Sequence, residues 1–369
     1  MKFTALKIIS LGSIVGLSSY LIFAPAGISP VAWQAPQNKG LTGDFAENQT
    51  LSQIQRIELD RSEGPEDLAA DKNGNVYFAL LDGSIRKIDP NGTISDVANT
   101  GGRPLGIEFD NAGNLIVADA YIGLLQVNAA GQVSTLVTEA DGVPVLYADD
   151  VDVAADGKIY FSDASTKFHA REYGTYGASL LDINEHGGNG RVLEYDPNTG
   201  KTSTLLSGLN FANGVSVSHD QQYLLVNETG SYRVLKVALN GPERGQAKVL
   251  VDNLPGFPDN LNRGHDGIYW LGLASPRSAP LDAMSENPGL RKVVQRLPAF
   301  MRPKAQRYGH VVAFDENGKI LVSLQDPLGM YAYTTGALEV GDKLYVSSLH
   351  EKALGLTMNP FATQTAGQE

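Results

Sequence analysis

Five acidic or amide residues recur at matching places along the chain, and together their side chains could bind a metal ion. They are Glu66, Asp149, Asn213 and Asp259, with Asn260 directly after the last, in the motifs GPED, YADD, FANG and FPDN. The three carboxylates and two amides form an oxygen-only set with a formal charge of −3. Such a set suits Ca²⁺, whereas zinc prefers histidine or cysteine, which these motifs lack. The sequence therefore predicts a calcium site if the fold brings these residues together.

An alternative interpretation is that each of these residues is an ordinary turn former. Aspartate and asparagine are common in the turns of β proteins, so any one of the motifs could be a turn. The recurrence of the same register in four places favours a shared site. Carboxylates that are brought together without a cation would repel one another strongly.

The motifs open copies of an internal repeat, which indicates the fold. Each copy has two or three alternating apolar runs separated by an acidic or Asn-Gly turn, a pattern typical of short strands in a repeat architecture. Six copies predict an all-β fold, a six-bladed β-propeller, in which the first strands surround a central channel and bring their starts together. The segment Ile54–Leu59 is expected to join the last blade and close the ring. The copies open at Glu66, Leu105, Asp149, Asn213, Asp259 and Ala337.

Two copies carry long insertions, at residues 166–190 and 276–308. Long excursions from a regular scaffold are often lids or binding loops. The second insertion contains LDAMSENPGLRKVVQRLPAFM, which has helical spacing with apolar and basic faces. It could cover the site, contact a membrane, or be an ordinary packed helix.

The N-terminus predicts export from the cytoplasm. Lys2 and Lys7 precede the apolar run Ile8–Ala24, which is nearly long enough to span a bilayer and is followed by a possible cleavage site at Ala24-Pro25-Ala26. We expect a membrane-anchored protein with an extracytoplasmic (periplasmic or luminal) propeller, or a secreted one if the segment is cleaved. The expected parts are a signal-anchor or signal peptide at 1–28, a linker at 29–50, the propeller at 51–360 and a polar tail at 361–369.

Composition excludes several other functions. The net charge is −12 and no Lys/Arg cluster is interleaved with aromatic residues, so no nucleic acid partner is expected. The chain has no cysteine, which excludes disulfides and thiolate nucleophiles. The six histidines show no metal-ligand spacing, and His169, in the first insertion, is the one expected to face the channel.

The motifs also resemble those of a known family. GPEDLA, GRPLGI, VADAYIGLLQV, DDVDVAADGKIYFSDAS, GRVLEYDP, FANGVSVS and GFPDNL look, in this order, like strictosidine synthase-like proteins, particularly the adipocyte plasma membrane-associated protein group. The wider superfamily, with paraoxonases and gluconolactonases, implies a six-bladed propeller with Ca²⁺ in its channel. By resemblance the ligands fall on Glu66, Asn213, Asp259 and Asn260, and Asp149 stands where relatives usually have asparagine.

Other functional residues of these relatives are absent. The resemblance places Leu105 and Asp119 where paraoxonases have their proposed catalytic histidines, and Thr335 where strictosidine synthase has its glutamate. Strictosidine synthesis is therefore not expected. The similarity to gluconolactonases puts an aspartate with ligand and base roles at Asp259. We expect a calcium-dependent hydrolase of small-molecule lactones or (aryl) esters, with Asp259 accepting a proton; the alternative is a membrane-tethered, non-catalytic binding propeller with a structural calcium.

Overall fold

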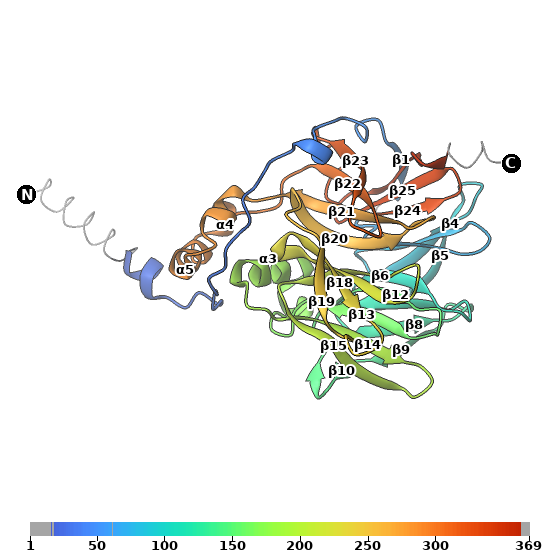
Figure 1. The fold of residues 1–369 in the computed structure, drawn as a ribbon, viewed down its shortest axis with the longest axis horizontal. Helices are drawn as coiled ribbons and strands as arrows, with labels where there is room; N and C mark the ends of the chain where they lie inside the picture. Colours follow the sequence, from blue (N-terminus) through green and yellow to red (C-terminus); the bar gives the residue numbers. More distant parts are fainter. Residues whose placement is uncertain (1–15, 17, 61, 363–369) are drawn as a thin grey trace, which may run out of the picture.

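The computed structural model describes residues 16, 18–60 and 62–362, and in this part of the chain six four-stranded antiparallel sheets form a ring (Figure 1). Each sheet is one blade, and in five of the six the strands follow one another along the chain from the channel outward. The all-β six-bladed propeller is therefore confirmed. The first three blades are β2 (Leu68–Ala70), β3 (Val76–Ala79), β4 (Ser84–Ile88) and β5 (Ile94–Asn99); β6 (Pro104–Phe109), β7 (Leu115–Asp119), β8 (Gly123–Val127) and β9 (Val133–Val137); and β12 (Ala148–Val153), β13 (Ile159–Asp163), β14 (Gly190–Asp196) and β15 (Lys201–Leu209).

The remaining three blades complete the ring, and the last takes its outer strand from the other end of the propeller sequence. Strand β1 pairs antiparallel with β26, with Gln55 opposite Leu356, so the expected closure is confirmed. Closure leaves the first and last blades joined without a free seam. These blades are β16 (Ala212–Val217), β17 (Tyr223–Glu228), β18 (Arg233–Ala238) and β19 (Ala247–Val251); β20 (Gly256–Arg263), β21 (Ile268–Pro276), β22 (Gly309–Asp315) and β23 (Ile320–Asp326); and β24 (Thr334–Val340), β25 (Lys343–Ser348), β26 (Ala353–Met358) and β1 (Gln55–Glu58).

Aspartate and glycine make the tight hairpins within the blades. In the first blade Asp71 Oδ1 accepts hydrogen bonds from the backbone N–H groups of Asn73 and Asn75, while Gly74 takes a φ of +78°. Asp110 makes the same bonds in the second blade. A side chain that bonds its own backbone two residues on favours a turn, and glycine tolerates the left-handed conformation.

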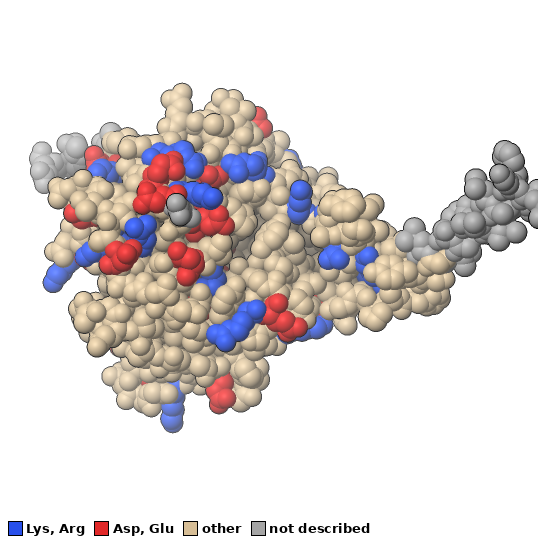
Figure 2. Space-filling model, turned by 180° about the vertical axis from the view of Figure 1, so that it is seen from behind, with Lys and Arg blue, Asp and Glu red and all other residues tan. Residues whose placement is uncertain are grey.

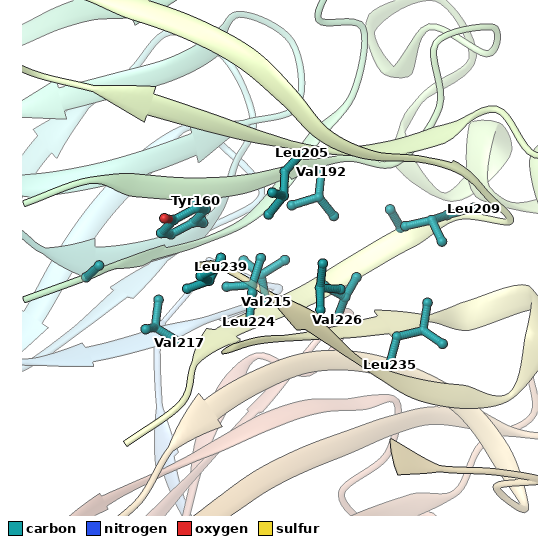
Figure 3. Packing of buried hydrophobic residues seen from close by; sticks show 13 residues of the cluster. Tyr160, Val192, Leu205, Leu209, Val215, Val217, Leu224, Val226, Leu235 and Leu239 are labelled. Carbon is teal, nitrogen blue, oxygen red and sulfur yellow. The ribbon is translucent and has the colours of Figure 1, made fainter. Parts of the chain in front are cut away.

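Apolar residues on the facing sides of neighbouring blades form the core. Figure 3 shows the contact between the third and fourth blades, where Val192 and Leu205 face Val215 and Leu224. Burial of alternate aliphatic residues stabilises each blade against the next, because each sheet has two apolar faces to cover.

Both insertions are helical and lie on the side of the propeller from which the N-terminal segment extends (Figure 1). The first forms α2 (Ala170–Tyr173) and α3 (Thr175–Glu185), and the second forms α4 (Ala279–Ala283), α5 (Pro288–Gln295) and η3 (Ala299–Met301). A short hairpin, β10 (Glu139–Ala140) and β11 (Val143–Pro144), and the 3₁₀ turns η1 (Gly43–Phe45) and η2 (Thr229–Ser231) complete the elements.

The segment before the propeller is held against both insertions. The N–H of Val31 donates to the carbonyl of Glu185 at 2.9 Å, and the N–H of Trp33 donates to the carbonyl of Ser285 at 3.1 Å. The Trp33 ring also stacks on His186, with 4.0 Å between ring centroids and 4° between planes. Residues 29–50 therefore act as a strap that joins the two lids.

The predicted membrane segment lies mostly outside the described residues. Of Ile8–Ala24, residues 18–23 are helical, and within the described part of the chain no helix is long and apolar enough to cross a membrane. Figure 2 shows that the described base of this extension exposes mostly uncharged atoms, whereas the blades carry interspersed acidic and basic groups. Of the polar tail, residues 363–369 lie outside the description.

Candidate active site

A cavity of about 750 Å³ lies at the end of the channel that the insertions cover. Glu66, Asp149, Asn213 and Asp259 all line it, so four of the five predicted site residues come together in one space. Most of the remaining wall is apolar. Both insertions contribute to the wall, as expected of lids or binding loops; their residues include Tyr176, Leu180, Ile183, Leu281, Val294 and Arg302.

Irregularities in the inner strands position these side chains. In three blades the pairing of the first strand with the second skips two residues. The skipped pairs are Asp149 and Asp150 in β12, Asn213 and Gly214 in β16, and Asp259 and Asn260 in β20. A bulge bends a strand and re-aims its side chains, and here it turns consecutive residues toward the channel. The same shift occurs in β6 and β24.

These irregularities define two equivalent layers in the channel, one residue apart in each blade. The layer nearer the cavity contains Glu66, Leu105, Asp149, Asn213, Asp259 and Thr335. The next layer contains Asp67, Gly106, Asp150, Gly214, Asn260 and Gly336. Asn260 therefore belongs to the deeper layer and is not among the residues that line the cavity.

The turn-former interpretation is wrong for most of the set. Asp149, Asn213, Asp259 and Asn260 all lie within strands. The glycine of the FANG motif serves close packing, because a Cβ on Gly214 would lie 2.4 Å from the carbonyl oxygen of Asp259. The inner strands of adjacent blades could not approach so closely with a larger residue there.

The buried oxygens of the site fit a hard cation. The amide nitrogen of Asn213 donates to Asp259 Oδ1 at 2.8 Å, and the amide nitrogen of Asn260 donates to the Glu66 carbonyl at 2.9 Å. Both amides thus turn their oxygens away from these partners. Among the five predicted site residues, the buried oxygens without a hydrogen-bond partner are Glu66 Oε2, Asp149 Oδ2, Asn213 Oδ1 and Asn260 Oδ1. An oxygen-binding cation would satisfy them, since unpaired buried polar atoms are costly.

Amide oxygens would be needed to complete such a site. Across the described ranges, no group of three or more acidic, histidine or cysteine side chains is arranged to hold a metal ion by itself. A cation at this floor would therefore have to take part of its ligands from amide oxygens, such as the unpartnered Oδ1 of Asn213.

Burial and mutual repulsion disfavour the charged forms of the three carboxylates. Burial, then the neighbouring carboxylates, raises the pKa of Glu66 well above its usual range, and the same causes act on Asp149. Burial raises the pKa of Asp259 to about 7. A nearby cation would reverse these shifts by stabilising the ionised forms.

The deeper carboxylates join neighbouring blades. Asp67 Oδ2 accepts the N–H of Ile107 at 2.9 Å, and Asp150 Oδ2 accepts the N–H of Val215 at 2.8 Å. Each bond crosses from one blade to the next, so these groups hold the ring together. Sequence reasoning missed this role, although both residues stand directly after predicted site residues.

Comparison with known proteins finds relatives that match most of the chain. The adipocyte plasma membrane-associated protein of Salmo salar is 35% identical over 340 residues, covering 85% of this chain and 80% of the relative. The chain belongs to the strictosidine synthase-like family. Strictosidine synthase-like 6 of Arabidopsis thaliana is 36% identical over 315 residues, covering 81% of this chain and 80% of that protein. The family models for strictosidine synthase and for the strictosidine synthase-like N-terminal region match residues 149–242 and 43–88.

Solved structures show the same fold in enzymes and calcium-binding proteins. A gluconolactonase from Xanthomonas campestris has a TM-score of 0.61 at 16% identity, covering 90% of this chain and 98% of that one. Regucalcin from Agrobacterium tumefaciens, a calcium-binding protein, has a TM-score of 0.55 at 16% identity, covering 85% and 90%. At this identity the likeness concerns the propeller alone.

This strictosidine synthase-like chain uses the remaining predicted positions for structure. Asp119 is fully buried, and its Oδ1 accepts the N–H groups of Arg103 and Tyr121. Thr335 is also buried and donates its hydroxyl to the Glu66 carbonyl at 2.5 Å. Leu105 lines the cavity as an apolar residue. None of these three positions therefore carries a base that lines the cavity.

Two cavity residues of the strictosidine synthase-like chain were not predicted. His169 caps α2 by accepting the N–H of Arg171, whereas His350, near the end of the propeller, lines the cavity. The expectation for His169 is therefore wrong, because this residue is the N-cap of α2 in the first insertion. Arg103 also lines the cavity and is almost fully buried. The sequence could have indicated this residue, because Arg103 in the motif GRPLGI directly precedes the first strand of a blade.

Proposed function

We propose that this protein is a calcium-dependent hydrolase of lactones or esters. One observation carries the proposal: four blades deliver oxygen side chains, several of them unpartnered, to the floor of a largely apolar, lidded cavity. A cavity of this kind suits a small apolar substrate whose reacting group meets a few fixed polar atoms. The fold shared with a gluconolactonase supports the same class of reaction.

Glu66, Asp149, Asn213 and Asp259 would hold the calcium ion, with Asn260 supporting it from the deeper layer. When bound, the ion would polarise the carbonyl of the lactone or ester and stabilise negative charge on its oxygen. The protein's own contribution is to keep these oxygens fixed. Thr335 and Asn260 anchor the backbone from which the Glu66 side chain extends, by donating to the main-chain carbonyl of Glu66.

Asp259 is the residue we assign as proton acceptor. Its Oδ1 is held by the amide of Asn213, and its carboxylate lines the cavity beside the other site residues. A general base must be ionised and within reach of the proton that it accepts, and a cation bound beside Asp259 would keep its carboxylate ionised. Asp259 would take the proton of the attacking water while Asn213 keeps its carboxylate oriented.

A second candidate function is binding without catalysis, in a propeller whose calcium is structural. The observation that favours it is the loss of the base at two positions, because Leu105 is apolar and Asp119 is engaged with backbone N–H groups. Fold alone does not decide between the two, since the same propeller serves several functions.

We further propose that the cavity opens next to a membrane to which the N-terminal segment attaches. Arg296, directly after α5, donates to the carbonyl oxygens of Leu21 and Ala24, so the second lid contacts the base of that segment. Phe300 and Met301 in η3 are 82% and 55% exposed. Exposed apolar side chains beside basic ones are typical of a surface that lies on lipid. The name of the Salmo salar relative, a plasma membrane-associated protein, agrees with this placement.

Turnover by the purified chain decides between the two functions. Neutral lactones and aryl esters are screened with calcium present and after chelation, while circular dichroism reports whether the fold survives. Calcium-dependent turnover that chelation abolishes without unfolding supports the hydrolase. If no lactone or ester is hydrolysed at saturating calcium, the binding propeller is the better account.

A further inference from the structure

Arg103 is a buried cation that protein groups leave largely unpaired. Its side chain lines the cavity, and the residue is only 1% exposed. Nη1 donates to the carbonyl of Pro104 at 3.2 Å, while Nε is buried without a partner. Among the described residues no carboxylate lies within 4.0 Å of the guanidinium nitrogens. A guanidinium has five N–H donors, so most of its hydrogen-bonding capacity is unused by the protein.

The position of Arg103 in the repeat makes the charge unusual. It stands two residues before the cavity layer of its blade, and the equivalent residues of the other blades are Gly64, Tyr147, Phe211, Phe257 and Tyr333. Three of these aromatic residues line the cavity, so Arg103 replaces an aromatic side chain in its wall. Gly64 leaves room for it, because a Cβ there would lie 3.3 Å from Arg103 Nη2.

The surrounding charges allow an anion to bind beside Arg103. Glu66, Asp149 and Asp259 contribute −3 and Arg103 contributes +1, which gives −2 for the ionised floor. A bound calcium ion would bring this sum to zero. Arg103 feels the carboxylates of Glu66 and Asp149 without pairing with them. Arg103 therefore keeps guanidinium donors that no protein acceptor uses, at a position in the cavity wall.

We propose that Arg103 recognises an anionic group of the substrate, and that the substrate is an apolar lactone or ester that also bears a carboxylate. A planar carboxylate matches the guanidinium fork, and the aromatic and aliphatic walls match an apolar body. The inference rests on the proposed function for the reacting lactone or ester group. The recognition of the carboxylate by Arg103 is a separate, measurable property.

Binding of matched acids and amides tests the proposal without requiring turnover. The purified full chain, saturated with calcium near neutral pH, is titrated calorimetrically with 4-phenylbutyrate, octanoate and decanoate and with the corresponding amides. We expect the acids to bind at least about tenfold more tightly than the amides. Arg103→Gln should weaken the acids by about tenfold to a hundredfold, the range for one charge-assisted pair, and leave the amides unchanged. Arg103→Lys should retain part of the preference.

Arg171→Gln is the matched control, because Arg171 is an exposed arginine of the first insertion and is not among the residues that line the cavity. It should leave the preference for acids intact. Equal binding of acids and amides, or no binding of either, overturns the proposal. The proposal also fails if Arg103→Gln weakens the binding of acids and amides alike, because that result indicates a structural role. It fails too if the preference for acids survives in Arg103→Gln and disappears on chelation, because that result places the anion on calcium. A failure of the proposed function would be seen in the turnover screen instead, as the absence of lactone or ester hydrolysis.

Discussion

Removal of calcium should make the stability of the propeller fall as the pH rises. In the metal-free site burial raises the pKa of Asp259 from 3.8 to about 7, and it raises those of Glu66 and Asp149 as well. A carboxyl group whose folded-state pKa lies above its unfolded value binds more protons in the folded state. Its stabilising contribution is complete below about pH 4 and is lost as the pH rises through about 7.

The magnitude is large enough to measure. The shift of Asp259 from 3.8 to about 7 corresponds to about 4 kcal/mol of stability between acidic and mildly alkaline pH. Calcium should oppose this loss, because it stabilises the ionised ligands. Free calcium at a hundredfold excess over its dissociation constant adds about 2.7 kcal/mol. The stabilisation by calcium should therefore be small near pH 5 and large near pH 8.

Thermal unfolding of the purified chain at pH 5, 6, 7 and 8, with calcium or with chelator, measures both effects. Asp259→Asn is the control, since it keeps the size of the side chain and removes one titrating group. Its stability in chelator should depend less on pH than that of the wild type. A pH-independent stability in chelator, or a calcium effect of equal size at pH 5 and pH 8, would falsify the assignment of these carboxylates to a cation site.

Three further predictions concern catalysis, the strap and the membrane. Asp149→Asn should weaken calcium binding but preserve or raise the rate of hydrolysis at saturating calcium, whereas Asp259→Asn should lower that rate about 10²–10⁴-fold. If both variants lose activity equally, and only in proportion to the calcium that they fail to bind, Asp259 is a ligand alone. Trp33→Ala removes the stack on His186 and should speed proteolysis within residues 166–190, the insertion that contains His186, whereas the exposed Gln34→Ala should not; unchanged digestion would show that the strap does not hold this lid. If Ile8–Ala24 is retained, the protein should stay with membranes through high-salt washing, whereas a mature N-terminus at Gly27 would establish cleavage.

The repeat made the blades and the site predictable. The first strand of each blade must begin at the channel. The polar residues that open four of the repeat copies were therefore predicted to converge, and they do: Glu66, Asp149, Asn213 and Asp259. The closing strand followed from the same logic, because an open ring would leave an edge unpaired. These inferences needed only the spacing of the copies.

The depth of individual residues could not be predicted in this way. At the bulges two consecutive residues turn inward, so the usual alternation fails, and β12 is buried at every position from Ala148 to Val153. Asn260 looked equivalent to Asp259 in sequence but belongs to the deeper layer. Arg103 was missed because a cation beside a proline resembles a loop residue, and its burial depends on the space left by Gly64 in another blade.

The ring of equivalent positions also indicates how the site is divided. The first, third, fourth and fifth blades supply Glu66, Asp149, Asn213 and Asp259, whereas the second supplies Leu105 with Arg103 two residues earlier. One sector of the floor therefore offers oxygens to a cation, and another offers an apolar surface beside a guanidinium. A substrate with a carbonyl at the first sector and a carboxylate at the second would be held at two points. Such a two-point hold would orient the carbonyl toward Asp259, which is the positioning that the proposed hydrolysis requires.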